Sequence, residues 1–132
     1  MRTCSIFSLV ILTSFGLTLA SLAAEHTTQS LAQIKQQIDD QKAVLVDVRE
    51  SKEWKAGHIE GAVLLPTSSI RDGLTSDELK PLPKDKILYV HCVVGQRALL
   101  AANALEKLGY KVRPMKPGYK EMISAGFSKA NP

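Results

Sequence analysis

The segment from Ile87 to Gly109 constrains the fold most, because its hydrophobic pattern changes from that of a strand to that of a helix around one cysteine. Residues 87–90 are an apolar run of strand-forming residues, followed by a glycine-containing turn. From Ala98 onward, apolar residues recur every three or four positions, which predicts a helix that ends at Gly109. Cys92 is therefore predicted to lie at the carboxyl end of a strand and at the start of a helix.

This position favours a reactive role for Cys92. Ligands bind outside the carboxyl ends of strands in open α/β sheets, and the first turn of a helix offers unpaired N–H groups and the positive end of its dipole. Gly95 allows the turn to curl so that its N–H groups point at one place. These features and the nearby Arg97 favour the thiolate, which is the nucleophilic form of cysteine. The alternative is a structural cysteine, since free cysteine is among the most buried residue types.

Residues 1–24 have the organisation of a secretory signal peptide. A positive Met1-Arg2 segment precedes an apolar stretch without charge, and small residues lead to an expected cleavage after Ala23 or Ala24. An uncleaved membrane anchor is the alternative, because the uncharged stretch is long enough to span a bilayer. The small residues at its end favour cleavage. We expect a periplasmic or secreted protein with no stable membrane association after the signal is cleaved.

Export would make the cysteine count informative. The chain has two cysteines, Cys4 and Cys92, and the first would leave with the signal peptide. A single remaining cysteine cannot form an internal disulfide, so it indicates reactivity or intermolecular pairing in an exported protein. The sequence has no Cys-x-x-Cys motif, which argues against a dithiol oxidoreductase.

The rest of the chain alternates between strand and helix patterns. This alternation predicts an α/β fold with a parallel central sheet flanked by helices on both faces. Residues 25–30 are polar and are expected to form a loose leader before a single domain over residues 31–132. Pro114 places the last strand at an edge of the sheet, since proline lacks an N–H donor. Strands are predicted at 43–46, 62–65, 87–90 and 111–115, and helices at 31–40, 51–56, 68–72, 98–108 and 119–125, with one short helix beginning near residue 76.

Several spaced motifs resemble the rhodanese-like domain family. Residues 45–50, Leu-Val-Asp-Val-Arg-Glu, and residues 57–62, Gly-His-Ile-Glu-Gly-Ala, look like the first block of that family. Residues 92–97, Cys-Val-Val-Gly-Gln-Arg, look like its active-site loop, Cys-x-x-Gly-x-Arg. The resemblance extends over nearly all of residues 31–127. Together with the signal peptide, it is similar to small periplasmic single-domain thiosulfate sulfurtransferases.

Three positions depart from the family pattern. Pro117 precedes Gly118 where the family usually carries Gly-Gly, and Met122 stands where a tryptophan is usual. A methionine can fill the apolar gap left by an indole, so we expect local repacking and retained activity. Ala98 follows the loop arginine where the family often has Ser or Thr, which removes a hydroxyl cap but leaves the backbone N–H groups in place.

The resemblance implies a sulfurtransferase that moves a sulfane sulfur from thiosulfate, or a similar donor, to a thiol or to cyanide. Cys92 would carry the sulfur as a persulfide, without a cofactor. Arg97 would bind the dianionic donor or brace the loop, because its guanidinium is a planar fork of donors with a fixed charge. A thiol protein of the periplasm is a candidate acceptor. The backbone N–H groups that would hold the sulfur are those of Val93, Val94, Gly95, Gln96 and Arg97.

Arg49 and Asp47 follow a predicted strand at the same edge as Cys92. Arg49 is a second candidate for binding the donor, although an ion pair with a neighbouring carboxylate such as Glu50 or Glu53 is at least as well supported. A buried aspartate at the end of a strand usually accepts hydrogen bonds from a neighbouring loop, and we expect this of Asp47.

Other classes of function have weaker support. The net charge of +4 is spread without a basic run, which argues against nucleic-acid binding, and three scattered histidines with one cysteine give no metal-ligand spacing. His91 is not expected to act as a base, because successive strand residues point to opposite faces. Related cysteine phosphatases and arsenate reductases use His-Cys-x5-Arg, whereas only four residues separate Cys92 from Arg97. This shorter loop forms a smaller ring of N–H groups, which suits one sulfur atom better than a tetrahedral oxyanion. A non-enzymatic sulfur carrier or binding module is the third alternative.

Overall fold

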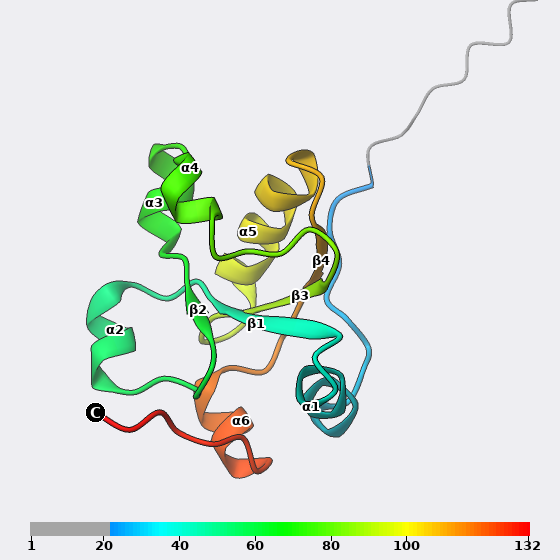
Figure 1. Cartoon of the computed structure of the whole chain (residues 1–132), viewed down its shortest axis with the longest axis vertical. Helices are drawn as coiled ribbons and strands as arrows, with labels where there is room; N and C mark the ends of the chain where they lie inside the picture. The colour runs from blue at the N-terminus through cyan, green and yellow to red at the C-terminus, as the bar shows by residue number, and fades with distance from the viewer. Residues whose placement is uncertain (1–21) are drawn as a thin grey trace, which may run out of the picture.

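Four strands form one parallel sheet in the order β2-β1-β3-β4 (Figure 1). The structure is a computed structural model that describes residues 22–132. β1 (Ala43–Asp47) and β3 (Ile87–His91) lie at the centre, and β2 (Val63–Leu64) and β4 (Lys111–Pro114) form the edges. All three strand pairings are parallel, so the predicted sheet type is confirmed, as is the edge position of the strand that ends in Pro114.

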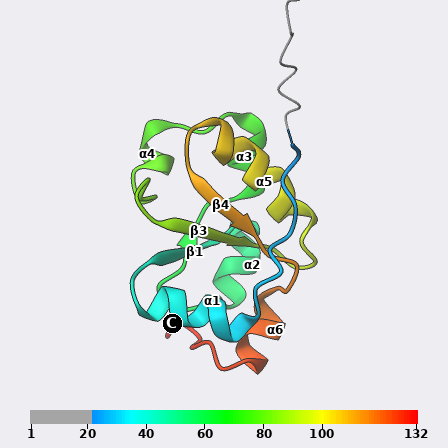
Figure 2. The ribbon, with the colours of Figure 1, turned by 90° about the vertical axis from the view of Figure 1, so that its right-hand side faces the viewer.

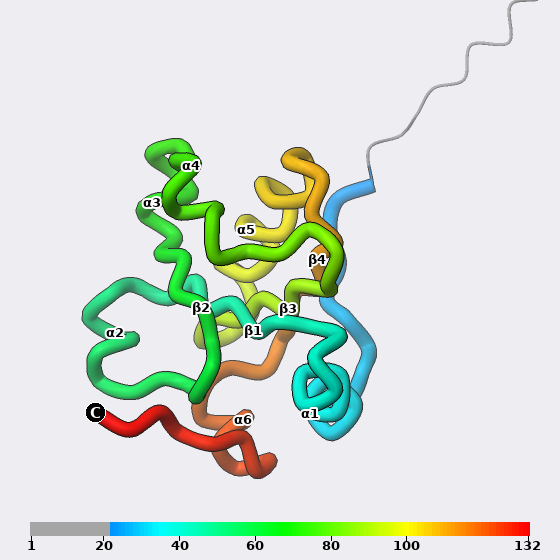
Figure 3. The backbone as a smooth tube through the Cα atoms, in the orientation of Figure 1, coloured from blue at the N-terminus to red at the C-terminus, as the bar shows by residue number. Residues whose placement is uncertain are grey.

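Helices cover both faces of the sheet, as predicted (Figures 1 and 3). α3 (Thr67–Asp72), α4 (Ser76–Leu79) and α5 (Gln96–Lys107) lie on one face. α1 (Leu31–Asp39) and α6 (Tyr119–Ser124) lie on the other, and α2 (Ser51–Ala56) follows the carboxyl end of β1. This arrangement leaves the carboxyl edge of the sheet to the loops that follow β1 and β3.

Alternate residues of the central strands enter two separate hydrophobic cores. Val46 packs with Leu105 in the core beneath α5, whereas Leu45 packs with Ile34 and Met122 in the core beneath α1 and α6. This division follows from the two-residue period of a strand that is buried on both faces. Met122 is fully buried, so the methionine occupies an apolar site.

Local sequence signals set the ends of several helices. Ser30 caps α1, because its hydroxyl accepts the Gln33 N–H at 3.2 Å while its own N–H donates to Gln33 Oε1 at 2.9 Å. Thr75 and Glu78 form the same reciprocal pair at the start of α4. α5 begins at Gln96, two residues before the predicted start, because Gly95 serves as its N-cap.

The polar leader is not loose. The Thr27 N–H donates to the Pro114 carbonyl oxygen at 2.8 Å, and the Ala24 N–H donates to Asn103 Oδ1 at 3.0 Å. Gln29 Oε1 accepts hydrogen bonds of 2.6 Å from the Tyr89 hydroxyl and from Arg113 Nη1. The segment runs past α5 and beside β4 before it reaches α1 (Figure 2). The prediction of a loose leader is wrong, because polar groups of this segment pair with groups of α5, β3 and β4.

The predicted signal peptide lies outside the described residues, except for its last three positions. Within residues 22–132, no helix combines the length and the apolar character needed to cross a membrane.

Replacing Leu105 with alanine should destabilise the protein by about 2–5 kcal/mol, because the buried side chain would leave a cavity between α5 and the sheet. Leu100 on the same helix is 38% exposed and is the matched control, for which Leu100→Ala should change the free energy of unfolding by less than about 1 kcal/mol. Urea-induced unfolding of both variants measures the difference. Equal losses would contradict the assignment of the core-facing side of α5.

Candidate active site

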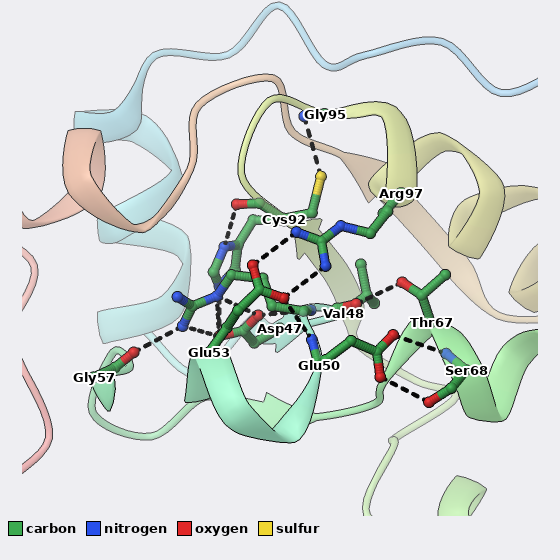
Figure 4. Close-up of polar contacts among 12 residues, drawn as sticks. Asp47, Val48, Glu50, Glu53, Gly57, Thr67, Ser68, Cys92, Gly95 and Arg97 are labelled. Carbon is green, nitrogen blue, oxygen red and sulfur yellow. Dashed lines mark hydrogen bonds and ion pairs between the residues drawn. The ribbon is translucent and has the colours of Figure 1, made fainter. Parts of the chain in front are cut away.

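Cys92 lies at the junction of β3 and α5, as the sequence predicts. The residue is 1% exposed, and its sulfur accepts a hydrogen bond of 3.1 Å from the Gly95 N–H (Figure 4). Gly95 has a φ of 94°, in the left-handed region that favours glycine. The turn therefore directs at least one backbone donor at the cysteine sulfur, while its role as nucleophile remains a prediction.

The segment after β4 packs directly on this turn. A Cβ atom at Gly118 would lie 2.7 Å from the Cys92 carbonyl oxygen and would also meet the carbonyl oxygen of Val93. Only glycine permits this approach, because backbone atoms cannot move aside as the end of a flexible side chain can. Pro117 leaves this contact intact. The start of α6 is thereby held beside the cysteine.

Arg97 forms a two-pronged ion pair with Glu53 of α2. Its Nη1 and Nη2 donate to Glu53 Oε2 and Oε1 at 2.7 and 3.0 Å. The hydrogen bonds from Arg97 hold the pKa of Glu53 down, from 4.5 to about 2, with help from the Glu50 N–H. The same pairing raises the pKa of Arg97, and the charge of a Cys92 thiolate adds to this effect. Arg97 thus lies beside Cys92 and links the turn after Cys92 to α2.

Arg49 is paired with Asp47, and not with the neighbouring glutamates. Its Nε and Nη2 donate to the Asp47 carboxylate at 2.9 and 2.6 Å, and Nη2 also donates to the Gly57 carbonyl oxygen at 2.8 Å. The Asp47 carboxylate also accepts the Arg49 backbone N–H, as expected of an aspartate that holds a loop. The guanidinium lies 4.9 Å from the centre of the Tyr119 ring. Donor binding by Arg49 stays a prediction, and most of its donors already have protein partners.

His91 directs its ring at Asp47 and not at the sulfur. Nε2 lies 3.6 Å from Asp47 Oδ2, and Nδ1 lies 3.3 Å from the Cys92 carbonyl oxygen. Burial lowers the pKa of His91, against the opposing effect of the Asp47 carboxylate. This geometry agrees with the expectation that His91 does not act as a base toward Cys92.

The mouth of the site is apolar at its centre and basic at its rim. Val93 and Val94 are 49% and 67% exposed, and Gln96 is exposed at the first position of α5. Two adjoining pockets share the two valines. Arg49, a candidate from the sequence, also lines one of these pockets. The sequence motifs gave no sign of the remaining lining residues, which the segment around Gly118 brings near the turn. These are Lys116, Pro117, Tyr119, Lys120 and Glu121.

Comparisons with known proteins agree with this geometry. The family model described as "Rhodanese-like domain" matches residues 30–125. "Probable adenylyltransferase/sulfurtransferase MoeZ" of Mycobacterium tuberculosis is 35% identical over 92 residues, which are 69% of this chain and 23% of MoeZ. The chain thus spans about a quarter of the length of that relative.

Solved structures show the same fold. The human single-domain sulfurtransferase TSTD1 superposes with a TM-score of 0.63 at 29% identity, over 74% of this chain and 95% of that one. A rhodanese-related protein from Thermoplasma volcanium gives a TM-score of 0.62 at 27% identity, over 76% of this chain and 93% of that one.

The ion pair between Arg97 and Glu53 predicts a defined pH dependence of stability. Because the pKa of Glu53 falls from 4.5 to about 2 on folding, the contribution of the pair is fully present above pH 4.5 and is lost as the pH falls toward 2. The side chains are 27% and 35% exposed, so we expect a contribution on the order of 1 kcal/mol. The difference in free energy of unfolding between wild type and Glu53→Gln should shrink over this range.

Glu60→Gln is the control, because it removes an exposed carboxylate outside the site. A wild-type advantage over Glu53→Gln that stays constant from pH 6 to pH 2 would show that the pair does not titrate as described.

Proposed function

Because the chain belongs to the rhodanese-like domain family, we propose that it is a sulfurtransferase that takes a sulfane sulfur from thiosulfate onto Cys92 and passes it to a thiol. The observation that carries this proposal is the Gly95 N–H directed at the Cys92 sulfur, at the junction of a strand and a helix. A donor at this place stabilises an anionic sulfur before and after transfer.

The first step is a nucleophilic displacement at the outer sulfur of thiosulfate. The Cys92 thiolate forms a bond to that sulfur, and the S–S bond of thiosulfate breaks as sulfite leaves with the electron pair. The product is a Cys92 persulfide with its negative charge on the terminal sulfur. Cys92 is only 1% exposed, so a donor must present a narrow terminal atom, as a sulfane sulfur does.

The second step transfers the terminal sulfur to an acceptor. A thiolate attacks that sulfur, the persulfide bond breaks, and Cys92 regains its thiolate while the acceptor becomes a persulfide. Cyanide can replace the thiolate and leaves as thiocyanate. Neither step requires a base once the thiolate is present, which fits a site whose buried histidine faces Asp47.

Lysines at the rim are suited to recognise the dianionic donor. The two arginines near the turn donate to Asp47 and Glu53. Lys116 and Lys120 are exposed, line the pockets beside the valines, and have no ion pair among the described residues. Exposed cations at such a mouth attract an anionic donor. They also hold its sulfonate oxygens at the rim, so that its outer sulfur points at Cys92.

The chain acts outside the cytoplasm under this proposal. The charge pattern of residues 1–24 supports export and cleavage after Ala23 or Ala24. An acceptor would then be a thiol of the periplasm, carried by a small molecule or by a protein.

Intact mass spectrometry tests the central step. Wild-type protein treated with thiosulfate should gain about 32 Da, one sulfur atom, and cyanide should remove it. Cys92→Ser should gain nothing while its unfolding transition stays cooperative. A wild-type protein without the gain, or a gain that persists in Cys92→Ser, would contradict the proposal.

The role of the rim lysines can be measured separately by steady-state kinetics. Lys116→Gln and Lys120→Gln should each raise the KM for thiosulfate about two- to fivefold and leave kcat nearly unchanged, because each removes one exposed charge. Lys111→Gln, which removes an exposed lysine at the start of β4 and so at the end of that strand away from the site, should have no effect. If the double variant kept the wild-type KM, the lysines would have no part in donor binding.

A further inference from the structure

The segment of residues 24–29, termed here the strap, is fixed to three separate parts of the domain. It hydrogen bonds to Asn103 of α5, to the Pro114 carbonyl at the end of β4, and to Tyr89 of β3. Figures 1 and 2 both place it beside β4. Cleavage after Ala23 or Ala24 would leave the contacts of Thr27 and Gln29 in the exported chain.

One side chain of the strap reaches the catalytic turn. His26 Nε2 lies 3.0 Å from the Gly95 carbonyl oxygen, and since a carbonyl oxygen only accepts, His26 is the donor. The ring also fills the space beside the Gly95 Cα, because a Cβ there would lie 2.5 Å from His26 Nε2. The adjacent Thr27 N–H, bonded to the Pro114 carbonyl at 2.8 Å, fixes the strap backbone next to this histidine.

The backbone N–H and the carbonyl oxygen of Gly95 therefore both have hydrogen-bond partners. Its N–H points at the Cys92 sulfur at 3.1 Å, and its carbonyl oxygen accepts from His26 and from the Leu99 N–H, the latter at 3.1 Å. Gly95 has no side chain, and its φ of 94° lies in a region that glycine leaves easily. The N–H and the carbonyl belong to the two peptides on either side of the Gly95 Cα, so their relative directions are set by the φ and ψ of this residue. By packing on the Cα and binding the carbonyl, His26 adds to the Leu99 hydrogen bond in restraining those angles and, through them, the direction of the N–H.

We propose that His26 is a positioning residue for sulfur transfer, which holds Gly95 so that its N–H stays directed at the sulfur of Cys92 and of its persulfide. His26 touches neither the sulfur nor the donor, so it acts through Gly95 alone. The predicted effect on kcat rests on the proposed function. The predicted effect on the position of the Gly95 N–H does not depend on any sulfur donor.

The test compares three variants of the purified protein. His26→Ala removes the donor, His26→Gln keeps an N–H donor at similar reach, and Thr28→Ala changes an exposed residue of the same strap. His26→Ala should lower kcat with thiosulfate about three- to tenfold, the worth of one hydrogen bond, and leave KM within about twofold. His26→Gln should restore most of the loss, and Thr28→Ala should resemble wild type.

Two further measurements need no sulfur donor. In His26→Ala, the Gly95 amide should exchange its hydrogen faster, and alkylation of Cys92 by iodoacetamide should slow, whereas His26→Gln should match wild type in both. A merely structural role would lower the unfolding temperature of His26→Ala without changing kcat well below that temperature.

The outcomes separate the two proposals. An unchanged kcat in His26→Ala, an equal loss in His26→Gln, or a change confined to KM would overturn the positioning role. If wild type forms no persulfide with thiosulfate, the proposed function fails. In that case, faster exchange at Gly95 and slower alkylation in His26→Ala alone would still support the positioning role, and unchanged values would overturn it as well.

Discussion

The left-handed backbone at Gly95 is the constraint on which the rest of the site depends. With a φ of 94°, this residue turns its N–H toward the Cys92 sulfur and still allows α5 to begin at the next residue. A Cβ at Gly95 would meet His26 on the strap and would lie 3.2 Å from the Lys116 Cα. One glycine therefore brings together the end of a strand, the start of a helix, the strap and the segment after β4.

The balance of charge around the sulfur suits transfer more than tight binding. Arg97 and Arg49 are held by Glu53 and Asp47, so the full positive charges nearest the sulfur are partly neutralised. A backbone N–H is a weaker partner for an anion than a free guanidinium. Under the proposed function, it would stabilise a persulfide enough for the persulfide to form and still allow an acceptor to remove the outer sulfur, as a group-transfer cycle requires.

The sequence predicted those features that depend on local pattern. The strand and helix periods around Cys92, the glycine after α5 and the edge strand that ends in Pro114 all follow from spacing or from a missing donor. The partner of Arg49 was also within reach of the sequence, because residues 47 and 49 point to the same side of an extended chain. The strap was not, since its polar residues pair with groups remote in sequence and polarity alone resembles that of a loose leader. Lys116 and Lys120 were missed because only the folded path of the segment after β4 brings them beside Val93 and Val94.

The mouth of the site has consequences for the order of events. Both pockets beside the turn share Val93 and Val94, the two residues that follow Cys92, and Cys92 itself is 1% exposed. Under the proposed function, donor and acceptor would reach the same sulfur past the same two side chains. Sulfite would have to leave before a thiol could enter, because both would occupy the line of attack on one atom. The shared entrance thus favours a double-displacement cycle, in which the persulfide would exist free of either substrate.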